Sequence, residues 1–191
     1  VRDEGEAAHR CPNDTHCPPQ IKGRIEHFIS RKAMNIMTLG PETIDEYFSR
    51  QLIHNIADLY TLTPMQITGG NTNRMVSAQK VVSSIRESVS VPFERVLFAL
   101  GIRMVGETTA KILARNFKSI DALMAAKVEE LTTIEGVGNT IAENVVAYFQ
   151  NSDNRDIIER LRAFGLQMSL SGQQLTLQGD ALAGKSIVIS G

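Results

Sequence analysis

A repeat of 32 residues runs through the middle of the chain and constrains its fold more than any other feature. Three alanines, Ala78, Ala110 and Ala142, are evenly spaced, and each begins an apolar pattern at i, i+3 and i+7. The patterns are Ala78/Val81/Ile85, Ala110/Leu113/Phe117 and Ala142/Val145/Phe149. Because this spacing puts apolar side chains on one face of a helix, each unit should bury one helical face. We therefore predict an all-α chain built from repeated helical units.

A short glycine-containing turn precedes the repeated helices and suggests their chemistry. The clearest is Gly136-Val137-Gly138, where glycine permits unusual backbone angles and a close approach by another backbone. The helix that begins after Gly138 presents unpaired N–H groups and a positive dipole end, both of which favour an anion. The turn is therefore predicted to bind a phosphate group.

Related turns occur at three other places. Residues 102–108 repeat the pattern with Met104 where the first glycine stands, and Thr38-Leu39-Gly40 precedes a helix expected to start at Pro41. Residues 68–74 have lost the apolar residue between the glycines, so we expect weak phosphate affinity there and mainly a scaffold role. We predict four helix-hairpin-helix motifs, one of them degenerate. Residues 102–108 and 136–140 should be the main binding pair, helped by residues 38–43.

The net charge of the chain is −1, yet the charge is unevenly distributed. Residues 93–118 hold five Lys or Arg and two Glu, while residues 119–135 are acidic. Since steering depends on where charge lies, a basic stripe remains compatible with a neutral sum. Lys111, Arg115 and Lys118 also fit a merely solvated helix face.

Several turns at regular spacing suit duplex DNA, whose phosphates form a ladder that is contacted without reading sequence. The candidate DNA-binding residues are Arg31, Thr38, Gly40, Arg103, Gly106, Thr108, Lys111, Gly136, Gly138, Asn139 and Thr140. Two other interpretations stay open: plain tight turns between packed helices, or a helical-repeat array that binds proteins. The chain lacks Trp and the Thr-Pro-Leu-His motif, which disfavours the common repeat arrays.

Both cysteines lie near the amino end, as Cys11 and Cys17. A structural zinc ion is coordinated by four ligands, so these two thiols supply at most half of a site. The pair fits either two unrelated reduced cysteines or the second half of a four-Cys finger whose first pair precedes Val1.

Other classes of protein are disfavoured by what the sequence lacks. No constellation of His, carboxylate or nucleophile suggests catalysis, and no apolar run approaches a membrane span. The start has neither an initiator Met nor an apolar signal segment, so we expect a piece of a longer protein.

Across essentially its whole length the chain resembles the carboxyl-terminal half of bacterial NAD-dependent DNA ligases. The resemblance rests on motifs in the order of that family: the Cys11/Cys17 knuckle, then residues 27–36, 58–63, 99–107 and 136–138. The tail, residues 182–191, is similar to the first strand of the family's closing BRCT domain. The helix-hairpin-helix region of another DNA repair protein is the nearest alternative.

The resemblance implies a domain order and a role. Residues 1–28 would be half of a zinc finger, 29–166 the helix-hairpin-helix domain, 167–180 a linker that floats, and 181–191 the start of the BRCT domain. The chain would grip nicked double-stranded DNA from the minor-groove side, next to the other ligase domains in cis, as a monomer in the bacterial cytoplasm. The parent would seal nicks with NAD and Mg, whereas the lysine that carries AMP lies upstream, so this fragment should not ligate. Zinc would be bound in the parent at Cys11 and Cys17, with the half site here empty.

Overall fold

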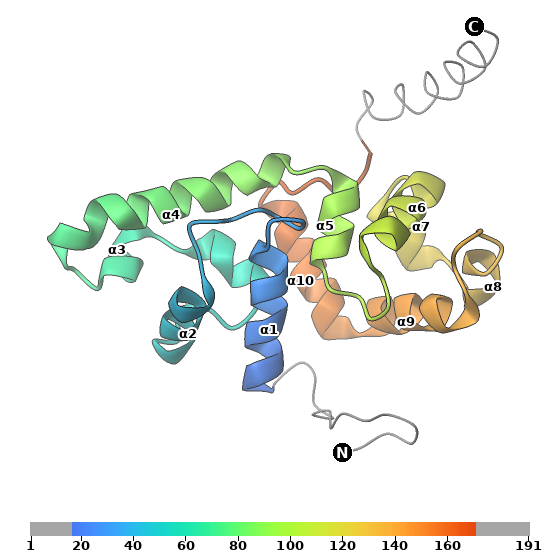
Figure 1. Ribbon diagram of the computed structural model, residues 1–191, viewed down its shortest axis with the longest axis horizontal. Coiled ribbons are helices and arrows are strands. Elements are labelled where there is room, and N and C mark those ends of the chain that lie inside the picture. The colour runs from blue at the N-terminus through green and yellow to red at the C-terminus, as the bar shows by residue number, and fades with distance from the viewer. Residues whose placement is uncertain (1–16, 171–191) are drawn as a thin grey trace, which may run out of the picture.

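The computed structural model describes residues 17–170, whose regular secondary structure is almost entirely helical (Figure 1). The α-helices are α1 (Pro18–Ile29), α2 (Pro41–Ser49), α3 (Pro64–Thr68), α4 (Met75–Glu87), α5 (Phe93–Ala99), α6 (Glu107–Phe117), α7 (Ile120–Ala125), α8 (Val128–Leu131), α9 (Asn139–Gln150) and α10 (Ser152–Ala163). Three 3-10 helices accompany them: η1 (Ile56–Thr61), η2 (Thr72–Arg74) and η3 (Ser88–Ser90). The only β pairing in this part of the chain is an isolated bridge between Ser119 and Ser169. The all-α prediction is confirmed.

Consecutive helices pack in pairs, and each pair is joined by one of the four predicted turns. The pairs are α1 with α2, α3 with α4, α5 with α6, and α8 with α9. In Figure 1 the α3–α4 pair lies at the left end of the long axis and the α8–α9 pair at the right end. Helix α10 runs between the two halves and contacts both η1 and α9. The chain thus presents its turns at intervals along an elongated body.

Local sequence signals explain where the helices start. Proline occupies the first turn of α1, α2 and α3, where its missing N–H costs nothing. Thr63-Pro64 and Ser119 are helix-start signals in the sequence, and both start helices: Thr63 forms a capping box with Gln66, and the Ser119 hydroxyl accepts the Ala122 N–H. Glycines in left-handed conformation follow α3 and α10, at Gly69 and Gly165.

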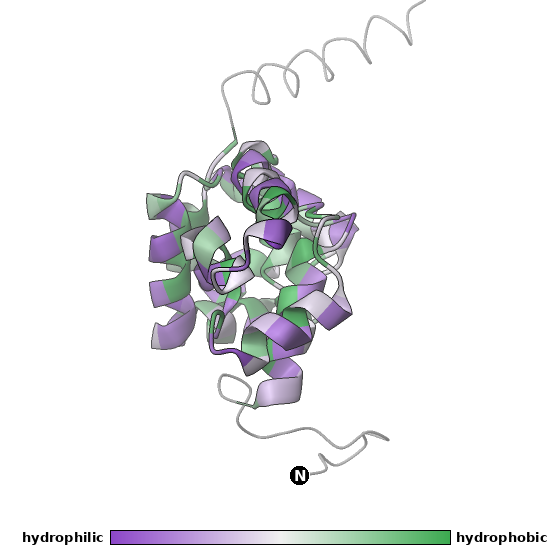
Figure 2. Ribbon diagram, turned by 90° about the vertical axis from the view of Figure 1, so that its left-hand side faces the viewer, coloured by the Kyte–Doolittle hydropathy of each residue, from purple (hydrophilic) through white to green (hydrophobic). Residues whose placement is uncertain are grey.

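The repeated alanines mark the packed faces of their helices. Ala78 is 1% exposed, and Ala110 and Ala142 are fully buried, so the predicted faces of α4, α6 and α9 do point inward. Figure 2 shows helices with hydrophilic and hydrophobic sides, the amphipathic pattern that such burial requires.

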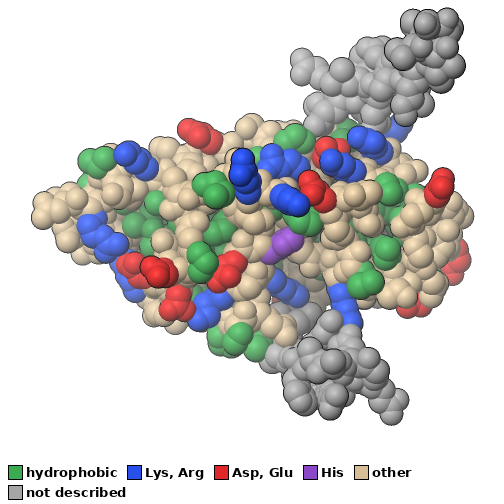
Figure 3. Space-filling view, in the orientation of Figure 1, with side chains coloured by type: hydrophobic (Ala, Val, Ile, Leu, Met, Phe, Trp, Pro, Cys, Tyr) green, Lys and Arg blue, Asp and Glu red, His purple; other side chains and the backbone are tan. Residues whose placement is uncertain are grey.

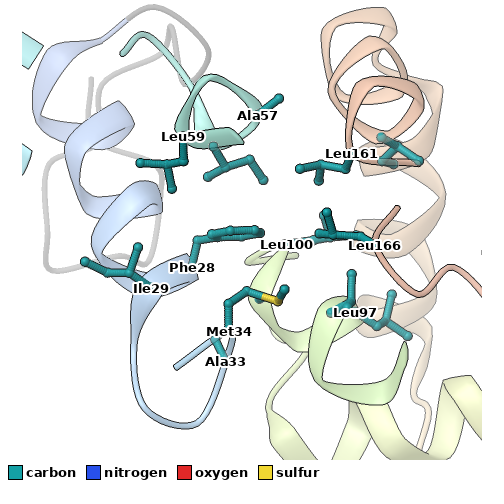
Figure 4. Close-up of a cluster of buried hydrophobic side chains, with 14 of the residues drawn as sticks. Phe28, Ile29, Ala33, Met34, Ala57, Leu59, Leu97, Leu100, Leu161 and Leu166 are labelled. Carbon is teal, nitrogen blue, oxygen red and sulfur yellow. The ribbon is translucent and has the colours of Figure 1, made fainter. Parts of the chain in front are cut away.

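One continuous core joins the two halves of the described chain. At its centre, α1 contributes Phe28, η1 contributes Leu59, α5 contributes Leu97 and α10 contributes Leu161, and these side chains converge in Figure 4. All four are at most 1% exposed. Helix α1 therefore belongs to the helical body, although the sequence assigns most of it to the zinc-finger side of a boundary at residue 28.

Two sequence expectations are wrong in detail. The sequence makes residues 53–60 a candidate connecting helix. The structure has the shorter 3-10 helix η1 there, because the Asn55 side chain accepts the Asp58 N–H and delays the start of the helix. The expected floating linker does not begin at residue 167, because Met168 and Leu170 are 8% and 7% exposed and are held against residues 118–120. The rest of the predicted linker, the BRCT strand and Cys11 lie outside the described residues. No helix of the described chain is both long and apolar enough to cross a membrane.

Candidate nucleic-acid interface

Three of the four turns share one backbone geometry. In each, an N–H donates to the carbonyl three residues earlier: Leu39 to Ile36 at 3.2 Å, Val105 to Ile102 at 3.0 Å and Val137 to Ile134 at 3.0 Å. The acceptor isoleucine and the donor residue are apolar and mostly buried, so the turn is fixed to the core from both sides. What remains exposed is the tip of the turn and the start of the next helix.

A glycine follows each of these turns and is the N-cap residue of the next helix. Gly40, Gly106 and Gly138 have φ angles of −128°, −84° and −79°, which any residue can adopt. A Cβ built on any of the three would meet nothing within 4 Å. The fold therefore gives no steric reason for glycine at these three positions. Glycine at a helix start would allow the backbone of a ligand to approach the first N–H groups closely.

Gly136 is glycine for a different reason. Its φ is +89°, and a Cβ would lie 3.2 Å from the Ile112 Cδ1 atom. In the second turn Met104 stands at the matching position and adopts φ +68°, a glycine-like angle on a residue with a side chain. Thr38 in the first turn does not have a positive φ, so the first turn reaches the same hydrogen bond by another route.

The predicted side chains surround these helix starts. Arg31, Thr38, Arg103, Thr108, Asn139 and Thr140 are exposed, and Lys111 is partly exposed. Thr108 and Thr140 lie in the first turns of α6 and α9, beside the open glycines. The Asn139 Nδ2 atom donates to the Glu143 Oε1 atom at 2.8 Å, so that amide already has a protein partner.

A cluster of cations that the sequence does not reveal lies between the first and second turns. The Arg95 Nη2 atom donates to the Arg31 carbonyl at 2.6 Å and its Nε atom to the Lys32 carbonyl at 3.3 Å. Lys32 Nζ also lies 3.7 Å from the Glu107 carboxylate. Figure 3 shows several Lys and Arg side chains gathered over α5 and the adjoining end of α4. One face of a nearly neutral chain thus gathers cations, with acidic side chains beside them, as the uneven charge of the sequence allows.

Comparison with known proteins identifies the origin of this arrangement. A family model described as the NAD-dependent DNA ligase C4 zinc finger domain matches residues 1–18. Proteins named DNA ligase match all of this chain: 54% identical in Phocaeicola vulgatus, 53% in Bacteroides fragilis and 46% in Flavobacterium psychrophilum. The chain is a homologue of one region of bacterial DNA ligases. It spans 29% of the length of the first two relatives and 28% of the length of the third.

A second family model, described as the helix-hairpin-helix motif, matches residues 95–158 of this chain. This match covers the turns at residues 102–108 and 136–140, which the sequence predicts to be the main binding pair. The predicted family resemblance is confirmed, as are a helix-hairpin-helix domain and a DNA ligase zinc-finger segment. The number of motifs and the contacts of each stay predictions.

The zinc-finger segment of the ligase region is only partly described. Cys17 is a partly exposed thiol directly before α1. A thiol suits zinc, but no group of three or more metal-ligating side chains assembles between residues 17 and 170. A complete four-ligand site is therefore not built from this part of the ligase region.

Arg95 and Lys32 are candidate interface residues that the sequence does not single out. Arg95 counts only as one cation of the basic stretch 93–118, and Lys32 only as the neighbour of Arg31. Arg95 is 63 residues from Lys32 along the chain, and no motif spacing connects the two. Only the packing of the α1–α2 connection against α5 brings them together.

Proposed function

We propose that this region of a DNA ligase holds nicked duplex DNA through backbone phosphates, without reading base sequence. The observation that supports it best is the repeated open glycine at Gly40, Gly106 and Gly138, each at the start of a helix. Three such starts along one elongated body match a ligand with a regular series of anions. The names of the relatives supply the class of reaction, nick sealing, in which this grip would serve.

Each turn would contribute two kinds of contact. The first N–H groups of α2, α6 and α9 would donate to phosphate oxygens, because the open glycines let the DNA backbone approach closely. Arg31, Arg103 and Lys111 would supply charge, and Thr108 and Thr140 would supply hydroxyl donors. Phosphate contacts of this kind position a protein on duplex DNA without specifying bases.

Within the whole ligase, this region would act as a monomeric clamp in cis with the domains that form the enzyme-AMP intermediate from NAD and use Mg. The chain alone would bind nicked DNA without sealing it, in the bacterial cytoplasm. Cys11 and Cys17 would supply two of the four thiolates that hold zinc in the parent protein.

The test is binding of a labelled nicked duplex by fluorescence anisotropy over a series of salt concentrations. We expect log K to fall linearly with log salt, by about 0.9 for each phosphate neutralised, and a Kd no tighter than about 1 μM at physiological salt. Duplexes of scrambled sequence should bind equally well. A flat salt response, or no binding at low salt, contradicts the proposal.

A further inference from the structure

The connection between α1 and α2 is held to α5 by the side chain of Arg95. Its Nη2 atom donates to the Arg31 carbonyl at 2.6 Å, and its Nε atom donates to the Lys32 carbonyl at 3.3 Å. Among the backbone hydrogen bonds between residues 17 and 170, none ends at either of these carbonyls. Arg95 therefore supplies hydrogen bonds that the connection does not make by itself.

The two residues held in this way bring positive charge to the start of α6. Both side chains are exposed, and the Lys32 Nζ atom lies 3.7 Å from the Glu107 carboxylate. Glu107 is the first residue of α6 and directly follows the open Gly106. A carboxylate at this place repels an approaching phosphate, so a cation beside it offsets the repulsion. The first motif thus delivers charge to the turn of the second.

The geometry of Arg95 suits holding a loop better than binding an anion directly. The side chain is partly buried, and two nitrogens of one planar guanidinium are directed at two successive carbonyls. A guanidinium presents its donors in a rigid fork, whereas the ammonium of lysine is a point charge on a flexible stem. The hydrogen bonds of Arg95 therefore depend on the shape of the group as well as on its charge.

Helices α1 and α5 stay joined without Arg95. The His27 Nε2 atom lies 2.8 Å from the Phe98 carbonyl oxygen, which is a second polar link between the two helices. Phe28 of α1 and Leu97 of α5 are fully buried in the common core. Loss of Arg95 should therefore release the connection between α1 and α2 while the helical body stays folded.

We propose that Arg95 is a positioning residue, which fixes this connection so that Arg31 and Lys32 present their charges to the duplex beside the second turn. The inference rests on the proposed DNA-holding function and assigns a cause to the spacing of two of its motifs. Arg95 would act through the two cations, without itself touching a phosphate.

The first experiment compares Arg95→Gln with Arg95→Lys by nicked-duplex affinity of the 191-residue chain across salt concentrations. Lysine keeps the charge but does not present the planar fork, so we expect both variants to bind about three- to tenfold more weakly than wild type. The slope of log K against log salt should fall by about 0.9 for each cation that leaves its phosphate.

The matched control is Arg155→Gln. Arg155 also donates to a backbone carbonyl through its Nη2 atom, but it does so at Gln150, the end of α9 opposite its turn. This variant should bind DNA with the wild-type affinity and salt slope. Melting temperatures confirm that every variant is folded at the temperature of the binding assay.

The second experiment places Arg95→Gln in the double variant Arg31→Gln/Lys32→Gln. The double variant removes two exposed cations, so it should keep the wild-type melting temperature while it binds DNA more weakly. If Arg95 acts through these cations, its substitution in this background lowers affinity less than about twofold. A direct phosphate contact by Arg95 would instead add its own loss and lower the slope by a further 0.9 or about that.

Three results overturn the positioning role while the proposed function stands. They are wild-type affinity in either Arg95 variant, an undiminished effect of Arg95→Gln in the double variant, and wild-type affinity in the double variant itself. The last of these does not depend on how well the Arg95 variants fold. If the wild-type chain shows no salt-dependent binding, the proposed function fails and the positioning role fails with it.

Discussion

Two classes of glycine at the turns separate ligand requirements from fold requirements. Gly138 has an ordinary φ and open space around its Cβ position, whereas Gly136 has φ +89° and lies against Ile112. The sequence shows both glycines as parts of one motif. The residue type alone does not tell whether glycine is needed for the close approach of a ligand or for the backbone angle of the turn. The coordinates are needed to assign a reason to each.

Gly138→Leu should therefore weaken DNA binding without unfolding the chain. Loss of one charge-assisted contact predicts about 10- to 100-fold lower affinity, with stability within about 0.5 kcal/mol of wild type. Gly136→Leu should instead cost stability, by about 1–2 kcal/mol for the left-handed angle plus the contact with Ile112. Anisotropy and urea unfolding measure the two effects. If Gly138→Leu binds DNA like wild type, this turn is not a contact.

At the scale of helices, sequence periodicity and capping signals predict most elements well. Thr63 and Ser119 start helices as their residue types indicate. The apolar spacing of residues 153–164 predicts a last helix, and α10 starts one residue before that stretch. The failure at η1 has a physical cause, since the capping by Asn55 acts through a side chain that periodicity ignores. The cation cluster around Arg95 was not predictable either, because it depends on how distant elements pack.

Helix α10 is bound to the amino half through Arg160. Its Nη2 atom lies 2.8 Å from the Asp58 Oδ1 atom, and Asp58 also accepts the His54 N–H. The Asp58 side chain is 16% exposed, so removing its cation leaves a mostly buried carboxylate with less compensation. Arg160→Met keeps the packing of the stem and should cost about 1–3 kcal/mol of unfolding free energy.

The matched control for this prediction is Arg155→Met on the same helix. Arg155 is exposed and its Nη2 atom donates only to the Gln150 carbonyl, at 3.2 Å. That variant should stay within about 0.5 kcal/mol of wild type in urea unfolding. Equal stabilities of the two variants would show that the Arg160–Asp58 pair does not hold α10 in place.

The pair between α10 and α7 predicts a dependence of stability on pH. Arg162 donates to both Asp121 oxygens, at 2.9 and 2.7 Å, and these hydrogen bonds and its charge lower the pKa of Asp121 below 3.8. A carboxyl whose pKa is lower in the folded state binds more protons when unfolded, so its contribution is present above about pH 4 and lost on further acidification.

Asp121→Asn should remove that contribution. The stability difference between wild type and Asp121→Asn is expected to be positive but modest at pH 7, since the side chain is 66% exposed, and to shrink as the pH falls from 4 towards 2. Thermal unfolding monitored by circular dichroism at several pH values measures it. A difference that grows on acidification would assign the lowered pKa another cause.

At the scale of the whole molecule, one core extends from α1 to Leu170. The segment that closes it was expected to be a linker because residues 167–180 are rich in Gln, Ser and Gly. Composition describes that stretch on average, whereas burial depends on single residues. Met168 and Leu170 alternate with exposed neighbours, a pattern of two apolar residues that is too short to predict a strand.

This closing segment leads to the last prediction, a comparison of chains that end at Leu170 and at Gly165. The shorter chain loses Leu166, Met168 and Leu170, all less than 9% exposed, and the hydrogen bonds of residues 168 and 170 to residues 120 and 118. Burial of each side chain contributes about 1.5–3 kcal/mol to the free energy of unfolding. Because the unfolded chain already buries part of this surface, the total loss is on the order of 5 kcal/mol.

A loss of that size approaches the total stability of many domains, about 5–15 kcal/mol. Because the core is continuous, we expect the shorter chain to melt as a whole at a much lower temperature and to lose DNA affinity with its fold, rather than to fray at its end. Circular dichroism melts and anisotropy on both chains measure these effects. Coincident melting curves would show that the segment lies on the core without stabilising it, and the helical body would then be complete at α10.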